Sequence, residues 1–401
     1  MAEKQNIPEI RFEGFTDPWE QRKFSDLTAR ASIQSSDSDL PQVEYEDIIP
    51  GEGTLNKDLS DKEGGKTGIK FYAGDVLYGK LRPYLMNWLY PQFNGVAVGD
   101  FWVLRATECD SSFLYRLVQT GSFQRLANVS SGSKMPRADW NLISQSFFAV
   151  PADRAEQKAI AKSLAELDNL ITLHQRKYDK LCTVKKSMLD KMFPKPGETE
   201  PEIRFEGFTD PWEQRKLGDC FEFLKNNTLS RADLNGDNGT ARNVHYGDIL
   251  IKFGDCLDGE RSDLPFITDD TVLPKFAGSI LREGDVIFAD TAEDEAAGKC
   301  VELRKLPKEP TISGLHTIPA RPRFPFGTGY LGHYLNSDAY HRQLLPLMQG
   351  IKVISVSKAA LQDTQVRFPG LSEQTAIGSA LSEIDTLITL HQREPRFADT
   401  G

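Results

Sequence analysis

A sixteen-residue segment occurs twice in this chain without a single change, and this duplication constrains the fold more than any other feature. The sequence PEIRFEGFTDPWEQRK occupies residues 8–23 and again residues 201–216. A repeat of this length and fidelity indicates two copies of one structural unit. The chain has 401 residues, which also suits more than one domain.

A second pair of related segments follows the duplicated leader in each half. EQKAIAKSLAELDNLITLHQR at 156–176 matches EQTAIGSALSEIDTLITLHQR at 373–393 in fourteen of twenty-one positions. The sequences between the repeats, at about 24–152 and 217–370, do not align by eye. Each unit is therefore a constant leader, a variable domain and a constant helix. The expected boundaries are 1–153 for the leader and first domain, 154–198 for a central helix and linker, 199–371 for the leader and second domain, and 372–401 for the second helix and a tail.

The variable segments are typical of mixed α/β domains, because short apolar runs alternate with Gly-Asp turns and helical stretches. Strand-like runs occur at 73–81 (AGDVLYGKL), 247–253 (GDILIKF) and 283–290 (EGDVIFAD). We expect a helix near residues 112–126 in the first domain and another near residues 330–345 in the second.

The constant segments predict long helices with a heptad seam, since apolar residues recur at spacings of three and four. The expected seam residues are Ile160, Leu164, Leu167, Ile171 and His174 in the first helix and Ile377, Leu381, Ile384, Ile388 and His391 in the second. Asp153 and Glu156 fit an N-cap and its N3 capping partner. The first helix would run from about 156 to 193, a length of ~57 Å.

Two such helices related by a pseudo-twofold axis must pack antiparallel, so we expect His174 and His391 to meet near the middle of the pair. The predicted fold is α+β: two mixed α/β domains separated by a pair of long antiparallel coiled-coil helices, with a pseudo-twofold internal repeat. This arrangement places the two domains at opposite ends of a rod. A long amphipathic helix lying on one domain is the alternative that the pattern leaves open.

Composition narrows the class of protein further. The N-terminus has no apolar signal segment, and no apolar run reaches the ~18 residues of a membrane-spanning helix. Five cysteines lie far apart with no CxxC pair, which argues against a zinc site or a disulfide framework. We therefore expect a cytoplasmic protein with reduced thiols, no metal site and no membrane contact.

The total charge of the chain and the distribution of charge along it point to different kinds of ligand. A net charge of −10 argues by itself against binding to nucleic acid. Residues 64–137, however, carry nine Lys or Arg against four Asp or Glu, and residues 299–367 carry ten against four. Each variable domain thus has a basic later part, which suits a polyanionic ligand, and a chance surplus of charge is the alternative.

With these features in place, the chain resembles the specificity subunit of type I restriction–modification systems. The resemblance rests on the duplicated leader, on GDVLYGKLRPYL at 74–85, on SGSKMPRADW at 131–140 and on the repeated EQxAI…LITLHQR helices. It implies a non-catalytic subunit in which two target-recognition domains read the two halves of a split double-stranded DNA sequence. It also implies two methyltransferase subunits that dock on this chain and motor–nuclease subunits that join through them. No cofactor is then expected in this chain, and S-adenosylmethionine, ATP and Mg would serve the partners.

Two loops of the first domain carry the candidate DNA-binding residues, which are Lys80, Arg82 and Tyr84 in YGKLRPY, and Lys134 and Arg137 in SGSKMPRADW. The small residues of the second loop allow close approach to phosphate. An arginine here could instead read guanine in the major groove. A solvated surface charge is the alternative for each residue.

The second domain has a matching loop, QGIKVISVSKAAL at 349–361, so Lys352 and Lys358 are its candidates. The loop lacks the Met-Pro-Arg core, which weakens the correspondence. Trp19 and Trp212, one in each leader, are interpreted as packing the leader onto its domain, with methyltransferase docking as the other possibility.

Other functions have weaker support in the sequence. Gly65-Lys66-Thr67 lacks the glycine that a phosphate-binding loop needs at position 60, which is Ser60. The acidic run from Asp290 to Glu295 could bind a divalent cation, although a solvated loop is favoured. A two-headed scaffold that binds proteins, and a nuclease acting alone, are alternatives that salt dependence and metal-dependent cleavage would test.

The second constant helix departs from the family pattern, because Glu394 and Pro395 follow its LHQR sequence and break the helix. In antiparallel pairing, Ile160, Leu164 and Leu167 would then lie partly uncovered unless a partner subunit packs there. A truncated specificity subunit that is inactive or altered in specificity is therefore a further hypothesis.

Overall fold

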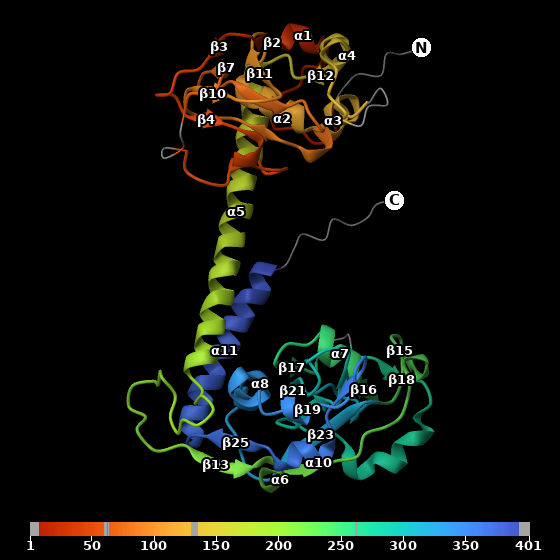
Figure 1. The fold of residues 1–401 in the computed structure, drawn as a ribbon. Helices are drawn as coiled ribbons and strands as arrows, with labels where there is room; N and C mark the ends of the chain where they lie inside the picture. The colour runs from red at the N-terminus through yellow and green to blue at the C-terminus, as the bar shows by residue number, and fades with distance from the viewer. Residues whose placement is uncertain (1–7, 60–61, 63, 130–134, 261–263, 393–401) are drawn as a thin grey trace. The chain divides into compact units, whose positions relative to one another are not determined.

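The structure is a computed structural model that describes residues 8–59, 62, 64–129, 135–260 and 264–392 (Figure 1). These residues pack into two compact units, Met1–Thr172 and Leu173–Gly401. The division falls inside the longest helix, α5 (Arg154–Lys191). The central segment expected at 154–198 is therefore shared by the two units.

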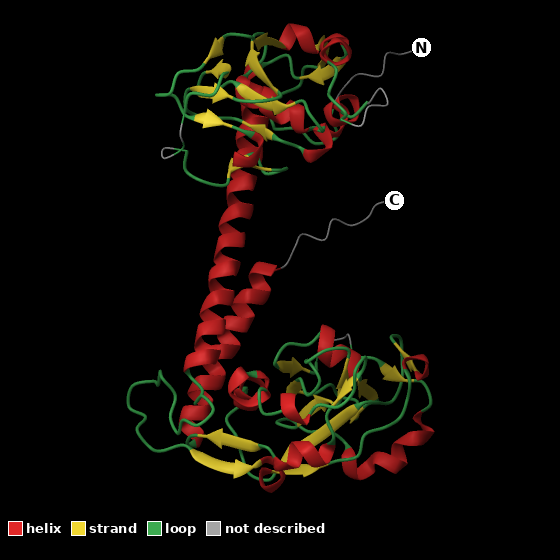
Figure 2. Cartoon of the chain, viewed as in Figure 1, coloured by secondary structure: helices red, strands yellow, loops and turns green. Residues whose placement is uncertain are grey.

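The first unit is built on two four-stranded sheets, with strand orders β3-β7-β10-β4 and β2-β11-β8-β9 among its described residues (Figure 2). Its strands are β1 (Glu20–Lys23), β2 (Thr28–Ala31), β3 (Gln34–Ser35), β4 (Gln42–Val43), β5 (Ile48–Ile49), β6 (Thr54–Leu55), β7 (Gly68–Phe71), β8 (Val76–Gly79), β9 (Trp88–Leu89), β10 (Gly95–Ala97), β11 (Phe101–Ala106) and β12 (Phe147–Val150). Its helices before α5 are α1 (Phe24–Leu27), α2 (Ser111–Gln119), α3 (Gly121–Ala127) and α4 (Trp140–Gln145), with 3-10 turns η1 (Tyr45–Asp47) and η2 (Pro83–Leu85).

The second unit contains a five-stranded sheet, β14-β23-β19-β21-β17, and a four-stranded sheet, β15-β18-β16-β22, within its described part. Its strands are β13 (Glu213–Lys216), β14 (Phe221–Phe223), β15 (Leu234–Asn235), β16 (Arg242–Val244), β17 (Cys256–Asp258), β18 (Phe266–Ile267), β19 (Val286–Ala289), β20 (Thr291–Ala292), β21 (Cys300–Lys305), β22 (Thr311–Ser313), β23 (Thr317–Pro322), β24 (Ile354–Ser355) and β25 (Gln365–Phe368). Its helices are α6 (Leu217–Cys220), α7 (Tyr246–Ile251), α8 (Tyr330–Asn336), α9 (Asp338–His341), α10 (Lys358–Asp363) and α11 (Leu371–Gln392), with 3-10 segments η3 (Arg231–Asp233), η4 (Asp270–Ser279) and η5 (Leu345–Leu347).

The variable domains are built alike, although their sequences do not align by eye. In the first unit β8 and β11 pair antiparallel with Phe101 opposite Gly79, and in the second β19 and β23 pair with Thr317 opposite Ala289. A buried aspartate directly precedes the first strand of each pair, β8 or β19, and its carboxylate binds an arginine on the neighbouring strand. These bidentate ion pairs are Asp75–Arg105 and Asp285–Arg321. The same aspartate–arginine pair at the same place in both domains indicates a common backbone arrangement.

Some local predictions were wrong. The run at 247–253, expected as a strand, lies largely in helix α7, where the His245 side chain accepts a hydrogen bond from the Gly247 N–H at the first turn. The helix expected near 112–126 is two helices, α2 and α3, because Thr120 ends the first and caps the second. Likewise the stretch near 330–345 is divided into α8 and α9 at Ser337.

The second unit contains an antiparallel pairing of the constant helices, between the later part of α5 and α11 (Figures 1 and 2). The Nδ1 atoms of His174 and His391 lie 2.9 Å apart, so the predicted meeting of the two histidines is observed. Further along, Lys185 contacts Asp385, so the residue number rises on one helix as it falls on the other. This order of contacts is the antiparallel one.

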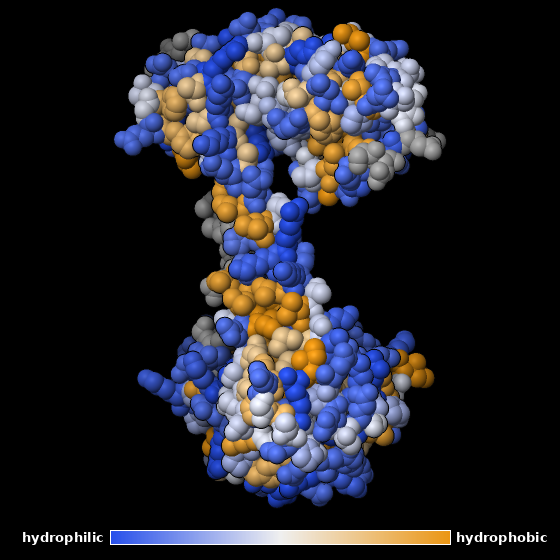
Figure 3. Space-filling model, turned by 90° about the vertical axis from the view of Figure 1, so that its left-hand side faces the viewer, coloured by the Kyte–Doolittle hydropathy of each residue, from blue (hydrophilic) through white to orange (hydrophobic). Residues whose placement is uncertain are grey.

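The seam residues fall into three environments. Ile377 and Leu381 are buried with Met192 and Phe193 in the main core of the second unit, while Ile384, Ile388 and His391 are half-buried. Ile160 is partly buried against the core of the first unit. Leu164, Leu167 and Ile171 are exposed on α5. Figure 3 shows apolar residues, in orange, gathered on the surface of the constant helices. The expectation that the start of this seam is partly uncovered is therefore met at Leu164 and Leu167.

Within the described ranges, no helix is both long and apolar enough to cross a bilayer. The five cysteines are all free thiols, and burial raises the pKa of Cys109 to about 12 and that of Cys220 to about 11.

Candidate nucleic-acid interface

Each domain is held in a frame formed by its constant leader and its constant helix. The leader strand β1 pairs with β12, the last strand before α5, and β13 pairs in the same way with β25, the last strand before α11. Lys23 lies opposite Phe147 in the first unit, and Lys216 lies opposite Gln365 in the second. The duplicated EQRK sequence therefore closes each domain at its base.

A buried glutamate at the start of each constant helix completes the frame. The Arg11 guanidinium donates to both oxygens of Glu156 at 2.7 and 2.8 Å, and Arg204 does the same to Glu373 at 2.8 and 2.7 Å. The Trp19 indole also donates to Glu156 at 3.2 Å. The predicted capping role of Glu156 was therefore wrong, because a guanidinium offers this carboxylate a stronger, charge-assisted partner than a backbone N–H does.

The next residue of each constant helix binds the variable domain. Gln157 accepts from the Asp110 N–H and donates to the Pro151 carbonyl, at 2.7 and 2.8 Å. Gln374 accepts from the Gly327 N–H and donates to the Pro369 carbonyl, at 2.9 and 2.8 Å. The repeated Glu-Gln pair thus joins leader, domain and helix by the same bonds in both units. In the second unit, Trp212 is buried in the core, as expected for a residue that packs the leader onto its domain.

The two predicted DNA-binding loops of the first domain meet in the structure. The Leu81 backbone forms a bridge with Arg137, and the Arg82 N–H donates to the Pro136 carbonyl at 2.7 Å. Asp100 joins their side chains, because its carboxylate lies 3.4 Å from the Lys80 ammonium and 3.1 Å from the Arg137 guanidinium. We call this group the first rim: the loop from Lys80 to Met86, Asp100 and Arg137.

The first rim is held from below by Tyr45. The Tyr45 hydroxyl donates to the Asp100 carbonyl at 2.6 Å and accepts from the Leu81 N–H at 3.2 Å. Burial raises the pKa of Tyr45 to about 12, so the hydroxyl stays protonated. Burial by itself would raise the pKa of the Asp100 carboxyl, but Arg137 and Lys80 outweigh it and lower this pKa. Asp100 is therefore ionised and holds both cations in place.

The first rim presents cationic and apolar groups to solvent. Arg137 is 51% exposed, and Arg82 is exposed with no side-chain partner among the described residues. Tyr84 is 54% exposed beside the exposed Leu85 and Met86. Lys134 lies outside the described residues. The described candidates of the first domain therefore share one surface that suits a polyanion with flat, stackable groups.

The two candidates of the second domain lie in different settings. Lys352 is exposed, whereas Lys358 is the first residue of α10 and lies 5.1 Å from the Phe223 ring. The bridge between Leu81 and Arg137 corresponds to the pairing of Thr291 with Ser355. The sequence match therefore identified the loop, but the residue at the position of Arg137 is Ser355.

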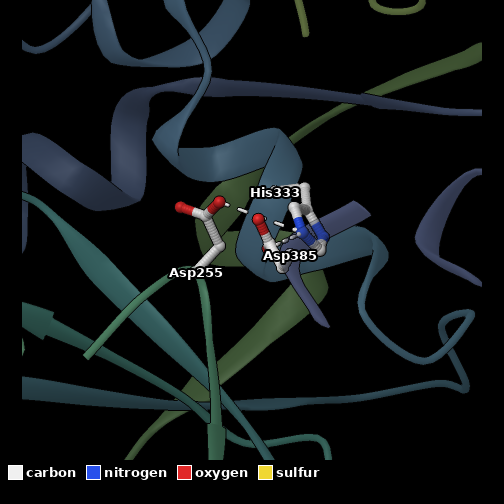
Figure 4. A group of neighbouring side chains, drawn as sticks. All are labelled: Asp255, His333 and Asp385. Carbon is white, nitrogen blue, oxygen red and sulfur yellow. Dashed lines mark hydrogen bonds and ion pairs between the residues drawn. The ribbon is translucent and has the colours of Figure 1, made fainter. Parts of the chain in front are cut away.

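A second group of charged side chains joins the second domain to its helix pair (Figure 4). Asp255, His333 and Asp385 place one ligand atom each within 4.8 Å of one another, an arrangement that could hold a metal ion. The Lys185 ammonium already pairs with both carboxylates, at 2.7 Å from Asp255 and 2.5 Å from Asp385. A metal would therefore have to displace a lysine.

Both carboxylates of this group have protein partners. The His333 Nδ1 lies 2.5 Å from the Gly329 carbonyl and its Nε2 lies 2.9 Å from Asp385. Each ring nitrogen therefore faces an acceptor, and the Lys185 ammonium lies between the two carboxylates. Burial would lower the pKa of Lys185, but the two carboxylates outweigh it and raise this pKa. We interpret the group as a structural ion-pair network.

Sequence reasoning missed Asp100, Tyr45 and this network. Asp100 precedes a strand and Tyr45 follows one, positions that carry no motif, and only the pairing of β8 with β11 brings them to the loop of Lys80. The acidic run from Asp290 to Glu295 was the other cation candidate, and no cluster with metal-ligand spacing is found there among the described residues.

Comparison with known proteins gives the following relatives. No protein-family model matches the chain. The type I restriction enzyme MjaVIII specificity subunit of Methanocaldococcus jannaschii is 24% identical over 295 residues, which are 71% of this chain and 65% of that protein. The type I restriction enzyme EcoDI specificity subunit of Escherichia coli is 26% identical over 175 residues, 41% of this chain and 39% of that protein. The chain thus covers less than two thirds of either relative.

Among solved structures, the S subunit of a type I restriction–modification system from M. genitalium has a TM-score of 0.57 at 11% identity, over 96% of this chain and 93% of that one. This similarity shows a common fold. Together with the two curated relatives, it confirms the resemblance expected from the duplicated leader and helix. The chain is similar to the specificity subunits of type I restriction–modification systems and shares the fold of a solved member of that family.

Proposed function

We propose that this chain is a non-catalytic DNA-recognition subunit of a cytoplasmic type I restriction–modification complex, with one variable domain for each half of a split target. The first rim carries this proposal. Lys80, Arg82 and Arg137 come from two distant loops and form one cationic surface, on which Arg82 and Arg137 are exposed and Lys80 is half-buried. Lysine and arginine on a rigid surface are the groups that contact phosphates and the acceptor edges of guanine.

The duplicated frame supports a target in two parts. Each leader and helix hold their domain by the same ion pair and the same glutamine bonds, while the domains differ in surface sequence. Two unlike readers on equal supports suit a DNA sequence with two unlike halves. Exchange of one domain should then change one half of the target.

The constant helices supply surface for partner subunits. Leu167 and Ile171 on α5 are 51% and 67% exposed, which is unusual for large apolar residues in a row on one helix. We propose that methyltransferase subunits, two because the frame is duplicated, pack on the constant helices, and that motor–nuclease subunits join through them. S-adenosylmethionine, ATP and Mg would be bound by those partners, and this chain would supply recognition alone.

The proposal is tested by co-expressing the chain with a type I methyltransferase subunit that assembles with it and mapping methylated bases across the genome. The expected result is methylation within a single bipartite motif. The matched variant Arg137→Gln should relax one position in one half of that motif and leave the other half unchanged. A sequence-independent pattern, or no methylation with an assembled complex, would contradict the proposal.

A two-headed protein-binding scaffold is the second candidate, because Tyr84, Leu85 and Met86 expose apolar surface on the first rim. Salt distinguishes the two functions. Binding to DNA releases counterions, so the affinity should fall steeply as salt rises. An apolar protein contact should keep its affinity over the same range.

A further inference from the structure

The second domain has a rim built on the same backbone bonds as the first rim. The Lys80 N–H donates to the Asp100 carbonyl at 2.9 Å, and the Asp290 N–H donates to the His316 carbonyl at 3.0 Å. The Lys80 carbonyl accepts from Ala138 at 2.8 Å, and the Asp290 carbonyl accepts from Val356 at 2.8 Å. Asp290 therefore stands where Lys80 stands, and His316 stands where Asp100 stands.

The support beneath the two rims also corresponds. Strand β4 runs parallel to β10 and is followed by Tyr45, and β16 runs parallel to β22 and is followed by His245 and then Tyr246. The Val98 N–H donates to Val43, and the Gly314 N–H donates to Val244, each at 2.9 Å. Tyr246 thus takes the place of Tyr45, and its ring meets the His316 ring edge to face at 5.3 Å. We call Asp290–Glu295, His316 and Ser355 the second rim.

Backbone strain marks both rims. Among the described residues other than glycine, the three with positive φ are Arg82 at 50°, Met86 at 54° and His316 at 54°. Two of them lie in the first rim and the third in the second. This conformation costs free energy for a residue with a Cβ atom, and such residues gather at binding and catalytic sites. The strain therefore singles out the same place in each domain.

The charges of the two rims are opposite. The first rim has Lys80, Arg82 and Arg137 around one aspartate, whereas Asp290, Ala292 and Ser355 occupy the corresponding positions of the second. Exposed Glu293, Asp294 and Glu295 follow directly on the chain. The second rim is therefore anionic. Its carboxylates are repelled by phosphates and only accept hydrogen bonds, so a carboxylate of this rim that binds DNA must accept from a donor group on a base.

The Asp290 carboxylate has room for such a donor. Its Oδ1 accepts from the Thr291 hydroxyl at 2.7 Å and lies 3.3 Å from the His316 Nδ1. Its Oδ2 has no partner among the residues that the structure describes. His316 is 47% exposed and Asp290 27%, so both side chains reach the surface while their neighbours hold them in place.

From these observations, and resting on the proposed DNA-recognition function, we propose that Asp290 and His316 are the specificity-determining pair of the second domain. The Asp290 carboxylate accepts a hydrogen bond from the exocyclic amino group of a cytosine or adenine in the major groove, and His316 orients it. Arg137 at the corresponding place of the first domain instead donates to the acceptors of guanine. One scaffold thereby reads two half-sites with opposite hydrogen-bond polarity.

The test is selection of duplexes from a library with a randomised core by the full chain in complex with its methyltransferase subunits. The wild-type chain should enrich a bipartite motif with an amino-bearing base, read by Asp290, in one half. Asp290→Asn and His316→Gln should each lower discrimination at one position of that half by about 5- to 150-fold and leave the other half unchanged. Arg137→Gln should do the reverse.

A matched control separates this effect from a general loss of acidic charge. Asp258→Asn removes a carboxylate of the same unit that pairs with Lys305 at the other end of the sheet, and it should leave the motif unchanged. Thermal unfolding of each variant checks that the domain is folded. If the wild-type chain enriches a bipartite motif that Asp290→Asn and His316→Gln leave intact, this inference is overturned and the proposed function stands. If the wild-type chain enriches no motif, the proposed function itself fails.

Discussion

The two units are most alike in their constant segments, whose sequences are identical or closely related. They differ most in the side chains of the variable domains, although the backbones of these domains still correspond. The closing strand pair and the arginine–glutamate ion pair at the start of each constant helix are the same in both units. The rims share their backbone bonds but carry opposite charge, with Lys80 and Arg137 in one and Asp290 and Ser355 in the other. The leader and the constant helix therefore hold the rim at the same place in each domain, while the side chains of the rim differ.

The largest expected effect concerns the arginine of each leader. Arg204→Ala should cost about 3–5 kcal/mol in the free energy of unfolding, because it leaves the Glu373 carboxylate buried without its cation. Arg11→Ala should cost less, since the Trp19 indole still donates to Glu156. The Trp212 indole nitrogen, by contrast, has no partner among the described residues. Urea unfolding of both variants measures the difference, and equal losses would show that Trp19 contributes nothing.

The next effect concerns Asp385 and Asp168, which occupy the same position in the two repeated helices. Asp385 pairs with Lys185 and His333, while Asp168 pairs with Arg116 and is 59% exposed. Lys185→Met should cost about 2–3 kcal/mol, because it leaves two carboxylates facing one histidine. Asp168→Asn should cost less than about 1 kcal/mol, as expected for an exposed pair. Urea unfolding checks both values, and a larger loss for Asp168→Asn would reverse the comparison.

A smaller effect is expected on DNA binding at the first rim. Arg137→Gln should weaken binding by about 1–3 kcal/mol and relax one base position if this arginine reads a base. Arg82→Gln should weaken binding equally for all sequences and reduce the salt slope by about 1, since a free exposed cation suits phosphate contact. Titrations with labelled duplexes at several salt concentrations distinguish the two roles. Unchanged affinity and specificity in both variants would remove the first rim from the interface.

The smallest effect concerns pH and the histidine pair of the second unit. Burial lowers the pKa of His391, and the nearby Lys177 and His174 lower it further. The unfolded chain therefore binds more protons below about pH 6.5, so this contribution to stability is present above that pH and is lost as the pH falls toward the folded pKa. His391→Leu should flatten the dependence measured by urea unfolding between neutral and mildly acidic pH. His341→Gln, which changes a histidine bonded to the Glu295 carbonyl, should leave it in place.

Much of the frame could be predicted from the sequence. The two constant helices, the antiparallel meeting of His174 with His391 and the packing of the leader onto its domain all follow from repeats and from heptad spacing. The strands at 76–79 and 286–289 were also expected, because each is a short apolar run after a Gly-Asp turn. Local patterns of this kind depend only on neighbouring residues, so they can be recognised without knowledge of the rest of the fold.

The partners of charged side chains could not be predicted from the sequence in the same way. Glu156 fits a capping pattern by spacing, yet it binds Arg11 from a segment far away in the chain. The run at 247–253 has the apolar content of a strand, but the cap at His245 and tertiary packing select a helix. In the second domain, Lys352 and Lys358 were chosen from the loop expected to match, while the backbone pairing gives the place of Arg137 to Ser355. Each error concerns a contact between segments that are distant in the chain. The spacing of residues in the sequence does not show which of several possible contacts forms.

Two copies of one unit, with constant ends and variable middles, could be recognised from the residues alone, since identity over a long segment requires no knowledge of contacts. Which residues of the variable domains occupy equivalent positions follows only from the folded backbone. Strand pairing brings Lys80 to Asp100 and Asp290 to His316, and such pairing depends on backbone hydrogen bonds that tolerate almost any side chain. Side chains can therefore diverge until no alignment remains while the backbone still holds them at equivalent positions.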